Sequence, residues 1–204
     1  MIRFKEYLKE EFKTGSLTIF DIDDTLFHTT AQIAVVKDGK IIKKLTNQEF
    51  NNYTLEAGES LDFTEFADAH KFYHESKPIT KMMTKAKAIL ANSVKNPDSK
   101  VVIITARANF DDRDKFLATF RKYGFDIDKV RVERAGNIEG EFIPAFKKAI
   151  IIRNYLNTKQ FSKVRLFDDS MSNLKEFLKL KKEFPSVTFE AFFANNDGTV
   201  KTIK

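Results

Sequence analysis

The chain has 204 residues, of which 42% are hydrophobic and 31% are charged, and its 21 Phe exclude a disordered chain and favour a compact core. The net charge of +6 and pI near 9.3 favour an anionic partner, but the lysines are interspersed with acids, so charge alone selects no class of ligand. The lack of Cys excludes disulfides, thiolate metal sites and cysteine nucleophiles.

No apolar run approaches the roughly 20 residues that span a bilayer. Residues 1–7 alternate charged with apolar groups, whereas a secretory signal carries a continuous apolar segment. We therefore expect one domain, residues 1–204, that stays in a cytoplasm and has no membrane partner.

Five short apolar segments alternate with longer helical patterns. The predicted strands cover residues 17–20, 101–104, 130–132, 164–167 and 187–193. The predicted helices cover residues 79–92, 111–123, 144–156 and 172–183. This alternation predicts an α/β fold in which helices cover a parallel sheet.

Residues 27–78 lie between the first two predicted strands and are too many for a simple crossover. Within them, the apolar segments 33–36 and 41–44 flank an Asp38-Gly39 pair, which indicates a tight hairpin. Residues 46–69 are more polar, with breakers at Asn51, Asn52 and Gly58, and we expect loops with one or two short helices there. The segment 27–78 is thus predicted to form a flap and a small cap.

Two acidic clusters follow predicted strands. Asp21, Asp23 and Asp24 come directly after residues 17–20, and Asp168 with Asp169 comes directly after residues 164–167. Carboxylates at the end of a buried strand repel one another unless a cation compensates them. Ligands of open α/β sheets bind at the carboxyl ends of the strands, so the two clusters meet if their strands are neighbours. Ligands that offer only oxygen favour a hard cation, and we expect Mg²⁺.

Thr105 follows the predicted strand 101–104, where its hydroxyl could donate to a phosphoryl oxygen. The alternative is a turn residue that bonds to the backbone. The predicted helix 144–156 carries Lys147 and Lys148 in its first turn, where a cation opposes the helix dipole, so one of the two is expected to serve a site while the other faces solvent. Arg107 either contacts a substrate or pairs with Asp111 or Asp112.

The segment 20–26, Phe-Asp-Ile-Asp-Asp-Thr-Leu, resembles the first motif of the haloacid dehalogenase superfamily. The pair 104–105, the helix-borne Lys147 and the segment 166–169 resemble its second, third and fourth motifs, in the same order. The resemblance implies a Rossmann-like parallel sheet with helices on both faces and a cap inserted after the first strand. At the fourth motif, Asn173 stands where many members carry a second acid.

The resemblance also implies the chemistry. The residue at Asp21 attacks the phosphoryl group and forms an aspartyl-phosphate, while the residue at Asp23 protonates the leaving oxygen and then activates water. An Asp at this second position marks phosphatases and disfavours a true dehalogenase. The implied metal ligands are Asp21, the backbone carbonyl of Asp23, and Asp169 with Asp168 beside it. Lys147 is favoured over its neighbour as the lysine that binds phosphoryl oxygens together with Thr105, and the candidate substrate contacts are Thr25, Arg107 and Lys148.

The predicted function is therefore that of a Mg²⁺-dependent phosphomonoesterase for a small phosphorylated metabolite or nucleotide. A first alternative is a nucleic-acid end-processing phosphatase, because residues 105–107, Thr-Ala-Arg, resemble the Ser-Gly-Arg of polynucleotide kinase phosphatase domains. A second is a non-catalytic structural or binding protein on the same fold. The chain also resembles small superfamily members carried by large tailed bacteriophages, which implies the host cytoplasm as its location.

Overall fold

The computed structural model describes residues 15–50, 52–140 and 143–204. Their largest sheet has six strands in the order β11-β10-β9-β1-β7-β8, and every neighbouring pair is parallel except β10 with β11. The strands are β1 (Gly15–Phe20), β7 (Lys100–Thr105), β8 (Arg131–Arg134), β9 (Phe161–Asp168), β10 (Thr188–Ala194) and β11 (Val200–Ile203). The predicted parallel sheet is confirmed, and its antiparallel edge strand β11 was not predicted.

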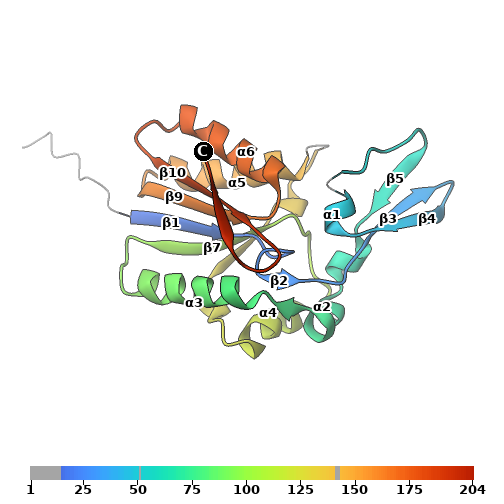
Figure 1. Ribbon diagram of the computed structural model, residues 1–204, viewed down its shortest axis with the longest axis horizontal. Coiled ribbons are helices and arrows are strands. Elements are labelled where there is room, and N and C mark those ends of the chain that lie inside the picture. The colour runs from blue at the N-terminus through green and yellow to red at the C-terminus, as the bar shows by residue number, and fades with distance from the viewer. Residues whose placement is uncertain (1–14, 51, 141–142) are drawn as a thin grey trace, which may run out of the picture.

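Helices cover both faces of this sheet (Figure 1). One face carries α2 (Ala69–Glu75), α3 (Thr80–Val94) and α4 (Arg113–Lys122), and the other carries α5 (Pro144–Asn157) and α6 (Met171–Lys179). Short 3₁₀ turns lie at η1 (Thr64–Ala67), η2 (Ile127–Lys129), η3 (Ala135–Asn137) and η4 (Leu180–Lys182). The four predicted helices correspond to α3, α4, α5 and α6 within a few residues at each end.

The strands are apolar on both faces because each face has its own core. On β1, Leu17 and Ile19 pack toward α5 and α6, whereas Phe20 packs toward α3 and α4. Phe20, Phe167 and Phe192 lie side by side on β1, β9 and β10, with ring centroids 4.8 Å and 4.6 Å apart. Phe20 and Phe167 come directly before Asp21 and Asp168, so this stack of rings holds the two strands together next to these acids.

The strand order reverses beside β1. From β1 the chain proceeds outward through β7 to β8, then returns to the opposite side of β1 as β9 and continues to β10. The carboxyl ends of β1 and β9 are therefore neighbours at the point where the direction of strand succession changes, which is where open α/β sheets bind their ligands.

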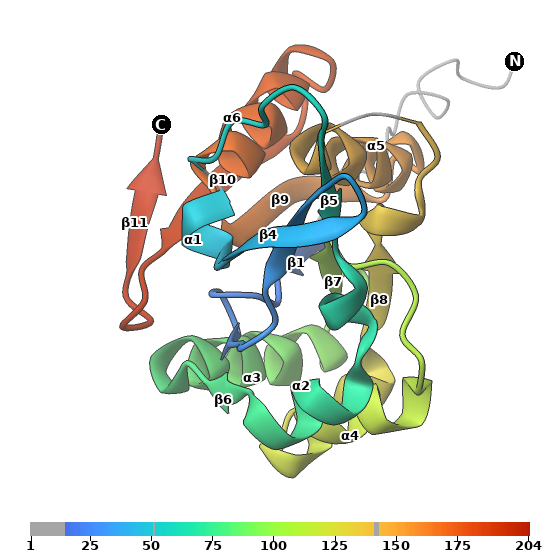
Figure 2. The ribbon, with the colours of Figure 1, turned by 90° about the vertical axis from the view of Figure 1, so that its right-hand side faces the viewer.

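Residues 27–78 form a separate antiparallel sheet in the order β4-β3-β5. It comprises β3 (Ile33–Lys37), β4 (Lys40–Leu45) and β5 (Glu59–Asp62). The short helix α1 (Asn47–Phe50) follows β4, and η1 and α2 follow β5. The strands β2 (Phe27–His28) and β6 (Lys77–Pro78) pair with each other at the two ends of the segment. Figures 1 and 2 show this sheet beyond the carboxyl ends of the central strands.

The predicted hairpin is confirmed: Asp38 and Gly39 have φ angles of 50° and 73°, the left-handed values of a tight hairpin turn. Strand β5 was missed, because its sequence Glu-Ser-Leu-Asp is mostly polar. No helix among the described residues is both long and apolar enough to cross a membrane. Residues 1–7, on which the expectation of no signal segment rests, and the predicted breaker Asn51 lie outside the described residues.

Candidate functional site

Three carboxylates meet at the carboxyl ends of β1 and β9. Asp21, Asp168 and Asp169 each offer an oxygen within 4.8 Å of the other two. The pairing of β1 with β9 continues into the site, because the amide of Asp21 donates to the carbonyl of Phe167 at 3.0 Å. The two acidic clusters therefore come together as expected through Asp21, Asp168 and Asp169.

Lys148 is the cation of this cluster. Its Nζ lies 2.8 Å from Oδ1 of Asp21 and 2.8 Å from Oδ2 of Asp168, and the residue is only 2% exposed. The expectation that Lys147 occupies this place is wrong, because the buried face of α5 consists of Ala145, Lys148, Ala149, Ile152 and Leu156. Lys147 is only half-buried and lies outside this set. The spacing of the apolar residues in this helix already carried the signal, since Lys148 shares their phase.

The cluster contains three acidic groups and one basic group. Burial, followed by repulsion from Asp168 and Asp23, raises the pKa of Asp21 to about 7 in spite of the attraction of Lys148. Burial and the neighbouring Asp168 and Asp21 raise the pKa of Asp169 to about 9. The pKa of Lys148 is raised as well, because the attraction of the two carboxylates outweighs its burial. One ammonium thus accompanies three carboxyl groups, and full ionisation of all three would leave two negative charges, which match a divalent cation.

Asp168 is the orienting member of the cluster. Its Oδ1 accepts from the amide of Ser170 at 2.9 Å and from Nδ2 of Asn173 at 2.8 Å, while its Oδ2 accepts from Lys148. The carboxylate of Asp169, in contrast, accepts no hydrogen bond from any residue that the structure describes. Asp169 and the second oxygen of Asp21 are therefore the groups best able to hold a hard cation, and the residues present fit Mg²⁺.

Asp23 lies in a second polar group next to the cluster. Oδ1 of Asp23 accepts from Thr29 Oγ1 at 2.7 Å and from Arg107 Nη2 at 2.7 Å, and its Oδ2 accepts from Arg107 Nε at 2.9 Å. Burial alone would raise the pKa of Asp23, but the charge and hydrogen bonds of Arg107, with the bond from Thr29, hold that pKa below its usual value. The sequence offered no signal for Thr29, which the chain contributes from the loop after β2.

The partner of Arg107 is thus Asp23. The expected pairing with Asp111 or Asp112 is not formed, because those carboxylates cap helices: Asp111 accepts from the amide of Ala69 and Asp112 from the amide of Lys115. The guanidinium of Arg107 instead turns toward the loop after β1.

Both threonines are fully buried, Thr105 at the expected end of β7 and Thr25 in the turn between β1 and β2. Oγ1 of Thr105 accepts from the amide of Arg107 at 3.2 Å, which is the turn contact considered as the alternative for this residue. Oγ1 of Thr25 has no hydrogen-bond partner among the described residues. Asp24, which lies between Asp23 and Thr25, has a left-handed φ of 54°, and its carboxylate accepts a hydrogen bond from Asn47 Nδ2 at 3.3 Å.

No protein-family model matches the sequence, and a comparison with curated proteins gives no match.

Proposed function

We propose that this protein is a Mg²⁺-dependent phosphohydrolase of the haloacid dehalogenase type that cleaves phosphomonoesters through a phosphorylated Asp21. One observation carries the proposal: at the switch point of the sheet, Asp21 and Asp168 hold the ammonium of Lys148 with Asp169 beside them, so that three carboxyl groups share one cation. A buried excess of this kind is costly without a cation and suits a site that takes up a metal together with a phosphate dianion.

Asp21 is the proposed nucleophile. In the first step an oxygen of Asp21 forms a bond to phosphorus while the bond from phosphorus to the ester oxygen breaks. The departing oxygen receives a proton from Asp23, which is ionised at rest and must first take that proton from the phosphate monoanion or from water. In the second step Asp23 takes a proton from water, the water oxygen bonds to phosphorus, and the bond to Asp21 breaks. The ionised Asp23 described above is the form that the second step uses.

Lys148 compensates charge as the phosphoryl group arrives. Its ammonium holds Asp21 and Asp168 in place and stabilises negative charge that develops on the transferring group. Asp21, Asp169 and the backbone carbonyl of Asp23 would hold Mg²⁺, with Asp168 beside it. When bound, Mg²⁺ supplies neutralisation of the carboxylates and polarises a phosphoryl oxygen.

Residues 27–78 are proposed to act as a cap that governs substrate choice. Their antiparallel sheet and α2 lie at the end of the molecule where the carboxylates are, and they contribute Thr29 to the hydrogen bonds of Asp23. Segments that overhang a strand-end site commonly select the substrate, while the strands carry the chemistry. The substrate class that fits this proposal is a small phosphorylated metabolite or nucleotide.

The test is trapping of the intermediate. With p-nitrophenyl phosphate and Mg²⁺, Asp23→Asn should lose about 10²–10⁴-fold in turnover, the usual contribution of a positioned acid or base. Because this leaving group needs little protonation, water attack should slow more than the first step, and a phosphoryl adduct should appear by intact mass after acid quench. Asp21→Asn is the blank and should show neither adduct nor turnover.

Two results would contradict the proposal. Turnover that persists in Asp21→Asn would indicate attack by water directly on phosphorus, and activity unchanged in excess EDTA would remove Mg²⁺ from the reaction. A panel of phosphorylated metabolites, nucleotides and 3′- or 5′-phosphorylated oligonucleotides then defines the substrate. Preference for the oligonucleotides would favour end processing, and turnover of none would favour a binding protein.

A further inference from the structure

Arg107 joins three parts of the chain that are distant in sequence. It lies just beyond β7, its Nε and Nη2 donate to both oxygens of Asp23 after β1, and its Nη1 donates to the carbonyl of Phe66 in η1 at 2.9 Å. The rings of Phe66 and Phe72 flank the guanidinium, with centroids 5.0 Å and 4.8 Å from its central carbon. One side chain therefore connects the reacting loop of the sheet to the segment 64–75 of the proposed cap.

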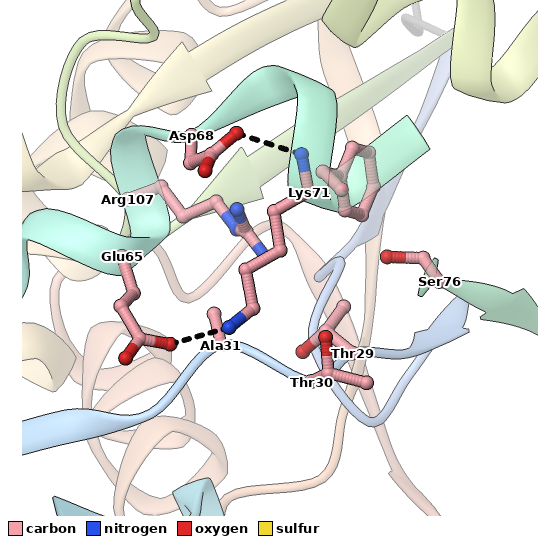
Figure 3. Close-up of a pocket in the computed structure, with 9 residues that line it drawn as sticks. Thr29, Thr30, Ala31, Glu65, Asp68, Lys71, Ser76 and Arg107 are labelled. Carbon is pink, nitrogen blue, oxygen red and sulfur yellow. Dashed lines mark hydrogen bonds and ion pairs between the residues drawn. The ribbon is translucent and has the colours of Figure 1, made fainter. Parts of the chain in front are cut away.

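The guanidinium is enclosed and does not face an open substrate site. Arg107 is 3% exposed. Figure 3 shows it in the recess framed by Glu65, Asp68 and Lys71 on one side and by Thr29 on the other. That recess has no internal space for a ligand. Arg107 is therefore poorly placed to bind a substrate directly, which was one of the two roles expected for it.

Only an arginine can make this set of contacts. Its planar fork donates two parallel bonds to one carboxylate and still has a further N–H for a carbonyl, and its flat face stacks on aromatic rings. A lysine at the same place keeps the charge but donates from a single nitrogen, so it cannot hold both oxygens of Asp23 and the carbonyl of Phe66 at once. The geometry is thus specific to the residue and not only to its charge.

We propose that Arg107 is a positioning residue that fixes the carboxylate of Asp23 and couples its position to the cap segment 64–75. The part of this proposal that concerns turnover rests on the proposed function. The coupling itself rests only on the contacts of Arg107. A movement of η1 and α2 would shift the guanidinium, and the guanidinium would shift the acid that exchanges protons with the substrate.

The kinetic test compares Arg107→Lys, Asp23→Asn and the double variant on p-nitrophenyl phosphate. Arg107→Lys should lower kcat by about 10–100-fold, the range typical of residues that orient an active-site group, while KM stays within about 2-fold. In the Asp23→Asn background the same change should have no further effect, because Arg107 acts through Asp23. Arg121→Lys is the matched control: Arg121 also holds a carboxylate, Asp128, with two nitrogens, but on an exposed surface. It should retain full activity.

A rise in KM that persists in the Asp23→Asn background would overturn the proposal in favour of direct substrate binding by Arg107. An equal loss in Arg121→Lys would show that the effect is not particular to this site.

Hydrogen exchange tests the coupling without any activity. Asp23→Asn should speed amide exchange in α2 by about 10-fold, the size expected when one charge-assisted hydrogen bond is weakened, although Asp23 makes no hydrogen bond to α2. In the Arg107→Lys background, Asp23→Asn should add nothing. Unchanged exchange in α2, or an equal increase in both backgrounds, would refute the coupling. If the wild type hydrolyses no phosphate ester but the exchange result holds, the proposed function fails while the coupling stands.

Discussion

Lys148 forms a buried ion pair with Asp21 and Asp168. A lysine that is 2% exposed loses nearly all its hydration. One carboxylate oxygen of Asp21 and one of Asp168, each 2.8 Å from Nζ, compensate that loss. Such a pair is seldom more stable than a well-packed apolar substitute, but removal of one partner leaves the others buried and uncompensated. The arrangement is therefore expected to be sensitive to loss of the ammonium.

Lys148→Ala should impair both folding and turnover. We expect a loss of about 3–5 kcal/mol in the free energy of unfolding without metal, because Asp21 and Asp168 lose their shared cation. Activity should fall by about 10²–10³-fold, as when a donor to developing negative charge is removed. Lys147→Ala is the matched control and should stay within about 0.5 kcal/mol. Urea unfolding in EDTA and turnover with Mg²⁺ measure the two effects. If Lys147→Ala lost activity and Lys148→Ala did not, the role proposed for Lys148 would be wrong.

At the scale of elements, the loop between β1 and β2 is a tightly closed turn. The carbonyl of Ile22 accepts from the amides of Leu26 and Phe27 at 2.9 Å and 3.0 Å, and the amide of Asp24 donates to the carbonyl of Phe27 at 2.8 Å. This closure requires the left-handed backbone of Asp24. A residue with a Cβ is strained in that conformation, whereas glycine is not.

Replacement of Asp24 by Gly and by Ala separates this strain from the contacts of the side chain. Both variants lose the hydrogen bond from Asn47 and the contact with His28. Only Gly relieves the strain, so Asp24→Gly should be more stable than Asp24→Ala by about 1 kcal/mol. Thermal or urea unfolding of the two variants measures the difference. Equal stabilities would show that the loop relaxes out of the left-handed conformation when the side chain is lost.

The sequence predicted the elements that carry a strong local signal. Buried parallel strands are continuous apolar runs, and Asp38-Gly39 is a hairpin turn by its own chemistry, so both were predictable. Strands β5 and β11 were missed because their residues are largely exposed or polar and pair only in tertiary context. In the site, the acids could be predicted from their place after strands. The partner of Arg107 could not, because it lies 84 residues away in the chain.

At the scale of the whole molecule, charge is distributed unevenly. The chain carries a net charge of +6, but the end of the sheet where β1 and β9 terminate holds three carboxyl groups that share one ammonium. The positive net charge can attract an anionic substrate toward the protein. The cluster itself repels a phosphate until a cation is bound. Metal uptake is therefore expected to precede substrate binding.

This layout makes the stability of the metal-free protein depend on pH. The pKa values of Asp21 and Asp169 are raised to about 7 and about 9 from 3.8, so the folded state binds protons more tightly than the unfolded state in this interval. Stability should then fall as the pH rises from about 4 to about 9. Mg²⁺ competes with those protons, because it binds the ionised carboxylates.

Mg²⁺ should therefore stabilise the protein more at pH 8 than at pH 5. At a hundredfold excess over its Kd the gain is about 2.7 kcal/mol, or roughly 5–10 °C in Tm for a chain of this size. At pH 5 the gain should be smaller, since Mg²⁺ must displace protons from Asp169. Asp169→Asn is the control: it removes a ligand and a carboxyl group whose folded-state pKa is raised, so the metal-free variant should melt above the wild type at pH 8 and respond little to Mg²⁺. Differential scanning fluorimetry at both pH values, with Mg²⁺ or EDTA, measures all four states. If Mg²⁺ left the Tm of the wild type unchanged at pH 8, or raised the Tm of Asp169→Asn as much as that of the wild type, the metal would not bind at this carboxylate cluster.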